Sequence, residues 1–159
     1  MLNFTSASVR IANSDRAVEE CLELMFDGQL PTSGVVMFHA TLGHRLNRIA
    51  EALHKRAPGL TVLGNSCSGV TGREGVGESM SDLAMMAVCG PSTEYGVDTV
   101  NEIYGDNAYE KGRLLASALH EQAPQAHTVY LLCPGIDIAN DLVVNAFVEV
   151  FGEEINIFG

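Results

Sequence analysis

The residues with the clearest chemical potential lie in two short segments, 39–44 and 64–69. The first holds His39 and Thr41, and the second reads Gly-Asn-Ser-Cys-Ser-Gly. Each follows an apolar run typical of a buried strand, which places both at the carboxyl ends of strands. Ligands of open α/β sheets bind at such ends, where backbone N–H groups and loop side chains converge. The expected ligand-binding residues are His39, Thr41, Gly64, Asn65, Ser66, Cys67, Ser68, Gly69 and Asp137.

Two other interpretations of these polar residues stay open. The first is that they only end the strands and satisfy the loop backbone through side-chain hydrogen bonds. The second is catalytic, with Cys67 as the nucleophile and His39 as its base, as in a cysteine-dependent hydrolase or transferase. A nucleophile elbow has a helix directly behind it, whereas a glycine-rich stretch follows Cys67. We therefore expect no catalytic residue.

The histidines and cysteines show no metal-binding spacing. His39 and His44 are five residues apart rather than four, and the four cysteines form no Cys-x-x-Cys pair. We expect reduced cysteines, mostly buried, and no resident cofactor. The alternative is haem, with His39 or Cys133, which precedes Pro134, as the axial ligand.

Composition narrows the possible partners. The chain has 159 residues, 47% of them apolar, and a formal net charge of −11. Its nine basic residues form no cluster that could neutralise phosphates, so nucleic acid is not an expected partner. No apolar run reaches the ~18 residues of a membrane span, and the first residues lack the pattern of an export signal. We expect a cytoplasmic protein without membrane insertion.

Strands alternate with helices along the chain, which predicts an α/β fold of layered sheets and helices built mostly from parallel βαβ units. A helix is expected to begin after the capping residues 13–15 and to end near Gly28. A flexible connection or hairpin is expected over the glycine-rich segment 64–77. Other helices are expected over 45–57, 108–123 and 141–151, and strands over 9–12, 35–38, 61–63, 83–89, 97–103, 129–132 and 155–158.

The two halves of the sequence, 1–93 and 94–159, resemble each other. The strand and helix that begin at Val35 correspond to those that begin at Val129, an offset near 94 residues. A two-fold internal repeat is one explanation, and the shared hydrophobic pattern of all βαβ units is the other. If the repeat is real, the second half ends early, and its unpaired sheet edge predicts a homodimer.

Two stretches carry a resemblance to a known family. Residues 34–44, Gly-Val-Val-Met-Phe-His-Ala-Thr-Leu-Gly-His, and residues 58–69, Pro-Gly-Leu-Thr-Val-Leu-Gly-Asn-Ser-Cys-Ser-Gly, resemble the N-terminal part of the FIST domain. Residues 140–159 are similar to the second half of that family. The sequence departs from the usual motif at three positions: Asn65 replaces a Cys, Cys67 a Ser or Thr, and Val70 a Glu.

The resemblance implies a sensory input module of bacterial signalling proteins. Such a domain passes its signal to an attached or separate output protein, and small molecules such as amino acids are its proposed ligands. Some family members bind haem. The resemblance therefore favours a non-catalytic, ligand-binding sensory domain. A module that docks on a partner through its acidic surface, without a small ligand, is a further alternative.

Overall fold

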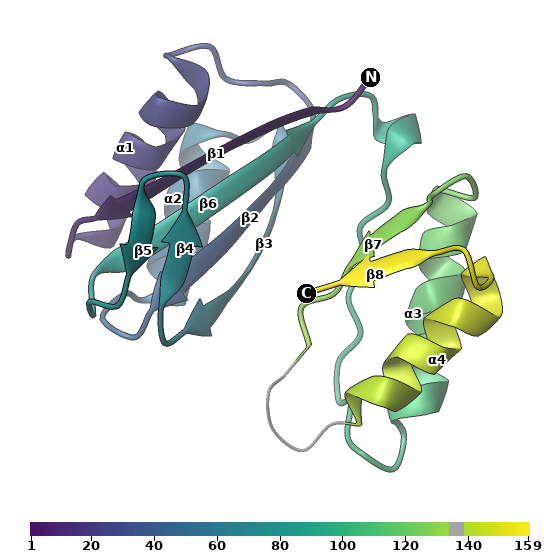
Figure 1. Ribbon diagram of the computed structural model, residues 1–159. Helices are drawn as coiled ribbons and strands as arrows, with labels where there is room; N and C mark the ends of the chain where they lie inside the picture. The colour runs from purple at the N-terminus through teal and green to yellow at the C-terminus, as the bar shows by residue number, and fades with distance from the viewer. Residues whose placement is uncertain (134–138) are drawn as a thin grey trace. The chain divides into compact units, whose positions relative to one another are not determined.

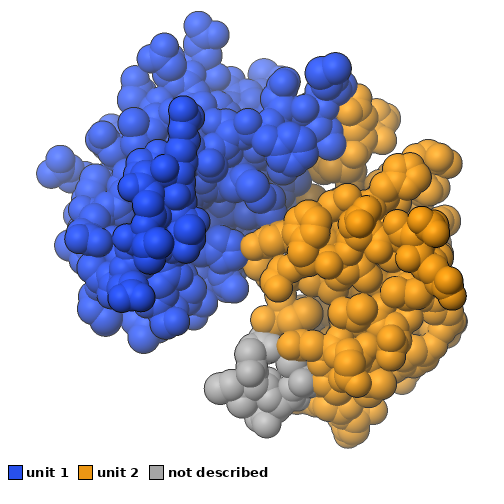
Figure 2. Space-filling model, viewed as in Figure 1, with its two compact units in different colours: residues 1–91 blue, residues 92–159 orange. Residues whose placement is uncertain are grey.

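The computed structural model describes residues 1–133 and 139–159 (Figure 1). The chain divides into two compact units, Met1–Pro91 and Ser92–Gly159 (Figure 2). Each unit has its own cluster of buried apolar side chains. The α/β fold class is confirmed, because helices and strands alternate along most of the described chain.

The first unit contains a four-stranded sheet, two helices and a small hairpin. In chain order its elements are β1 (Asn3–Arg10), α1 (Ser14–Phe26), β2 (Gly34–Thr41), α2 (Leu46–Arg56), β3 (Leu60–Cys67), β4 (Val70–Gly72), β5 (Gly75–Gly77) and β6 (Asp82–Cys89).

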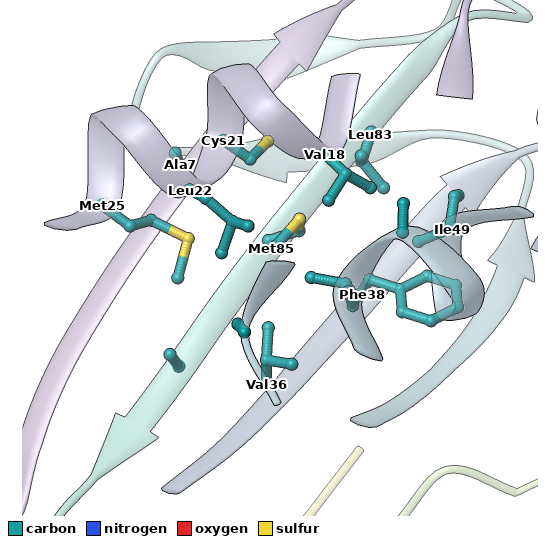
Figure 3. Close-up of a cluster of buried hydrophobic side chains, with 14 of the residues drawn as sticks. Ala7, Val18, Cys21, Leu22, Met25, Val36, Phe38, Ile49, Leu83 and Met85 are labelled. Atoms are coloured by element: carbon teal, nitrogen blue, oxygen red, sulfur yellow. The ribbon is translucent and has the colours of Figure 1, made fainter. Parts of the chain in front are cut away.

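Local sequence explains where α1 begins and how it packs. The side chain of Asn13 accepts a hydrogen bond from the backbone N–H of Arg16 at 3.0 Å, which caps the helix as predicted. One stripe of α1, which includes Val18 and Cys21, is fully buried. Figure 3 shows Val18 and Cys21 in one cluster of buried side chains with Val36, Phe38 and Met85 of the sheet. Both α1 and α2 cover this same face of the sheet (Figure 1).

The strand order of the sheet is β1-β6-β2-β3. The β2-α2-β3 unit has the predicted parallel pairing, whereas β6 runs antiparallel to both of its neighbours, β1 and β2. The expectation of mostly parallel strands is therefore correct only for strands joined by a helix. The reason is that β6 follows the β4-β5 hairpin, and no helical crossover returns the chain to the starting edge of the sheet.

Two strands extend further than predicted. Strand β2 continues through His39 to Thr41, and β3 continues through Gly64 to Cys67. The expectation that these residues lie in loops is wrong, because each remains in register with a partner on the neighbouring strand. The glycine-rich stretch that follows forms the β4-β5 hairpin, one of the two predicted forms.

The second unit packs two helices against a two-stranded parallel sheet. Its elements are a short 3-10 helix (Ser92–Glu94), α3 (Ala108–Gln122), β7 (Thr128–Tyr130), α4 (Asn140–Phe151) and β8 (Asn156–Phe158). The two helices pack closely at Gly112, where an added Cβ would lie 3.1 Å from the Cα of Val143. Phe147 is fully buried in this core.

The sequence predicts a strand over 97–103 and an internal repeat, and the structure contradicts only the first. The segment 97–103 is irregular in the structure. Here the backbone N–H of Val97 is bonded to the side chain of Gln122 instead of to a strand. The internal repeat stays a prediction: β7-α4-β8 has the same parallel arrangement as β2-α2-β3, but any two βαβ units share it.

Among the residues that the structure describes, we find no helix with the length and apolar character needed to cross a bilayer.

Candidate functional site

The structure brings His39 and Asn65 together across two parallel strands. They are register partners on β2 and β3, and His39 Nδ1 lies 2.7 Å from Asn65 Oδ1. Since the amide oxygen can only accept, Nδ1 carries the proton and donates it to Asn65. This side-chain hydrogen bond forms near the carboxyl ends of both strands, where ligands of α/β sheets bind.

The alternation of side chains along each strand decides which candidate residues share a face. Phe38 and Ala40 pack into the core beneath the helices, so His39 and Thr41 project from the opposite face. We call this opposite face of the sheet, which bears His39, Thr41, Asn65 and Cys67, the His39 face.

The expected ligand-binding residues of β3 are divided between the two faces of the sheet. Asn65 and Cys67 are paired with His39 and Thr41 on the His39 face, whereas Gly64 and Ser66 are paired with Phe38 and Ala40. An added Cβ at Gly64 would lie 2.5 Å from the ring of Phe38, so this glycine makes room for the core. The amide groups of 64–67 lie in a strand rather than in a turn around a ligand.

The side chain of Thr41 links β2 to the first residue of β6. It is only 2% exposed, and its hydroxyl donates to the carbonyl oxygen of Asp82 at 3.1 Å and accepts from the N–H of Asp82 at 2.9 Å. Both hydrogen-bonding roles of the hydroxyl are thus used by one backbone unit of β6.

The remaining candidate residues follow β3 or lie outside the described residues. Ser68 and Gly69 form the short connection between β3 and β4. Asp137 lies in the segment 134–138, outside the residues that the structure describes.

Cys67 has the properties of a protonated, half-buried thiol. Burial raises the pKa of this thiol, and a hydrogen bond with the backbone of Gly69 only partly offsets the effect. The cross-strand neighbour of Cys67 is Thr41 and not His39. His39 is bonded to Asn65, which precedes Cys67 by two residues, or about 6.6 Å at the usual rise of a strand. The geometry therefore does not favour a Cys67–His39 nucleophile and base.

The same observations bear on haem. Burial raises the pKa of the Cys133 thiol, whereas a cysteine that ligates haem iron does so as a thiolate. The Nδ1–H of His39 donates to Asn65, an arrangement that is also common for histidines that bind iron through Nε2, and Pro134 lies outside the described residues. Haem binding at His39 or Cys133 therefore stays a prediction.

Two polar contacts in the first unit were not predictable from the sequence. The Oγ of Ser14 in α1 lies 3.1 Å from Nδ1 of His44, which is buried, so this histidine links the first turn of α1 to the connection after β2. Glu74, in the turn of the β4-β5 hairpin, accepts hydrogen bonds from the N–H and the hydroxyl of Ser8 at 2.8 and 2.7 Å. No local pattern in the sequence signals either contact, because the partners are 30 and 66 residues apart.

Asp82, at the start of β6, bonds to the connection that follows the hairpin and to β1. This buried carboxylate accepts from the N–H of Ser79 at 2.6 Å and from Nε of Arg10 at 2.9 Å. An added Cβ at Gly77 would lie 2.6 Å from the carboxyl group of Asp82, so β5 passes directly over it. A cavity of about 190 Å³ remains between the hairpin and β1, and Ser8, Arg10, Glu74 and Asp82 supply its polar lining.

Residues 34–159 match the family described as the FIST N domain. The chain belongs to this family. The match begins at the first residue of β2 and includes both His39 and Asn65, which confirms the resemblance seen in the sequence. FIST domains form a family of sensory domains in signal transduction. No curated protein gives a significant match to the chain.

Proposed function

We propose that this FIST N domain is a non-catalytic sensory domain that binds a small polar ligand on the His39 face. The observation that carries the proposal is the hydrogen bond between His39 and Asn65 at the carboxyl ends of two parallel strands. The pair is partly exposed, so its polar atoms are not sealed into the core. In open α/β sheets, ligands bind beyond the carboxyl ends of the parallel strands, which are the ends nearest to this pair.

The chemistry of the pair supports a ligand with both donor and acceptor groups. With its oxygen bonded to His39, Asn65 still presents two N–H donors from its amide nitrogen. An acceptor such as a carboxylate or a carbonyl suits these donors. Amino acids, the ligands implied by the sequence resemblance, have this chemistry, and we propose them as the first class to test.

The structural effect of ligand binding is transmitted to the rest of the unit through β3 and the hairpin. Asn65 and Cys67 lie on the strand that leads through two residues into β4, and the hairpin is fixed to β1 by Glu74. A ligand that favours one position of the hairpin shifts the population of that state, which an output protein inside the cell can recognise. The protonated state of Cys67 supports a non-catalytic role.

The test is thermal-shift and calorimetric screening with the common amino acids. A ligand that binds only the folded protein raises its melting temperature. Replacement of Asn65 by Leu removes the donors at similar volume, and we expect affinity for the best ligand to fall about tenfold or more. The matched control is Asn47→Leu, at an exposed position of α2, which leaves affinity unchanged. Equal loss in both variants, or no response to any amino acid, contradicts the proposal.

A further inference from the structure

The four-stranded sheet has two edges, β1 and β3, and they are built differently. At the β1 edge, the carboxylate of Glu74 accepts a hydrogen bond from the backbone N–H of Ser8. The hairpin thus blocks part of this edge, and the charged side chain of Arg10 lies at its end. Covered backbone groups and charged side chains are common ways to prevent an edge strand from pairing with another chain.

The β3 edge has none of these protections. Its sequence, Leu-Thr-Val-Leu-Gly-Asn-Ser-Cys, contains no charged residue and no proline. Among the described residues, the backbone of 61–67 makes its hydrogen bonds with β2 and with no other element. Thr61, Gly64 and Ser66 are exposed along the strand. Because the ring of Phe38 excludes a side chain at Gly64, the exposed backbone at that position has no side chain of its own to shield it.

We propose that β3 pairs antiparallel with β3 of a second copy of this chain. Identical strands related by a two-fold axis form such a ladder, because each outward N–H then meets an outward carbonyl of the other copy. The neutral strand places no like charges opposite each other, although each chain has a net charge of −11. The product is one continuous sheet with four strands from each copy.

This dimer does not depend on the proposed ligand, and its test needs none. Sedimentation velocity on the wild-type chain, from micromolar to millimolar concentration, is expected to show a monomer–dimer equilibrium. Added sodium chloride is expected to strengthen the dimer, because it screens the repulsion between two acidic chains. A wild-type chain that stays monomeric at every concentration and salt level overturns the proposal.

A pair of matched variants locates the interface. Thr61→Lys places a charge on the exposed β3 edge, and Ser6→Lys places the same charge at an exposed position of β1. We expect Thr61→Lys to raise the dimer dissociation constant about tenfold or more and Ser6→Lys to leave it nearly unchanged. The proposal is wrong if Ser6→Lys weakens the dimer as much as Thr61→Lys does.

Hydrogen exchange on the wild-type chain gives a readout that does not depend on either variant. The amides of 61–67 that face away from β2 are expected to exchange more slowly as concentration rises, while those of Phe4 and Ser6 keep their rates. Circular dichroism establishes that both variants fold. Concentration-dependent protection confined to another element contradicts the β3 interface.

Discussion

Thr41 and Asn65 both lie on the His39 face, but their hydrogen-bonding groups are used to different extents. The hydroxyl of Thr41 both donates to and accepts from the backbone of Asp82, whereas the side chain of Asn65 bonds to His39 through its oxygen and makes no other hydrogen bond within the described residues. Two polar residues on the same face of the sheet, in cross-strand pairs two positions apart, therefore differ in their hydrogen bonding. This difference depends on burial and partners, which the sequence alone does not show.

The state of Cys67 gives a prediction at the scale of a single residue. Because burial raises the pKa of its thiol, we expect iodoacetamide to label Cys67 more slowly at neutral pH than it labels an unfolded cysteine. Cys21 is the internal control: burial raises the pKa of its thiol to about 12, so it should label only when the protein unfolds. Mass spectrometry of timed samples measures both rates. Faster labelling of Cys67 than of an unfolded cysteine would revive the catalytic alternative.

At the scale of elements, Asp82 joins β6, β1 and the connection from the hairpin through Arg10 and Ser79. Burial by itself raises the pKa of Asp82, but the hydrogen bonds from Arg10 and Ser79 outweigh it, so the pKa lies below its ordinary value. A lowered folded-state pKa stabilises the protein above the unfolded pKa of about 3.9. This stabilisation is lost as pH falls through the lower folded value.

Asp82→Asn tests this assignment. The substitution keeps the size of the side chain but removes the negative charge that accepts hydrogen bonds from Arg10 and Ser79. We expect the free energy of unfolding to fall by about 1–3 kcal/mol. Urea denaturation at a series of pH values measures it. The difference between wild type and variant should be constant near neutral pH and shrink below about pH 4. A difference that grows as pH falls contradicts the assignment.

The helices and the hairpin could be predicted from sequence, but the ends of β2 and β3 could not. Asn13, the apolar stripe of α1 and the glycines around the hairpin act locally, so their effects are visible in one segment. Residues 39–41 and 64–67 are polar or small and resemble a loop, yet pairing with neighbouring strands keeps them extended. The sequence predicts that Gly64 begins a flexible connection or hairpin, whereas in the structure a glycine is needed there because Phe38 occupies the adjacent space.

The candidate site was only partly predictable for the same reason. The sequence identified the two strand ends that hold His39 and Asn65, since apolar runs precede both. Which residues of each strand share a face depends on register, and a shift by one residue exchanges the faces. The sequence therefore predicts Gly64 and Ser66 as ligand-binding residues together with Asn65, although both are paired with residues on the helix-covered face of the sheet.

At the scale of the whole molecule, the chain has two separate apolar cores, one in each unit. Phe147 is fully buried in the second core and Ile49 in the first. We expect Phe147→Ala to destabilise the second unit by about 3–5 kcal/mol and to speed hydrogen exchange in α3, α4, β7 and β8. Ile49→Ala, the matched control, should do the same for the first unit only. Loss of protection throughout the chain in either variant would show that the two units unfold together.

The most direct test of the sensory proposal is a nuclear magnetic resonance titration of the whole protein with amino acids. The two side-chain amide protons of Asn65 and the ring protons of His39 report on the hydrogen-bonded pair itself. We predict that these signals shift in proportion to ligand occupancy, while the side-chain amide of Asn47 on the surface of α2 does not move. Shifts that leave Asn65 and His39 unchanged, with binding signals elsewhere, would contradict a ligand site on the His39 face.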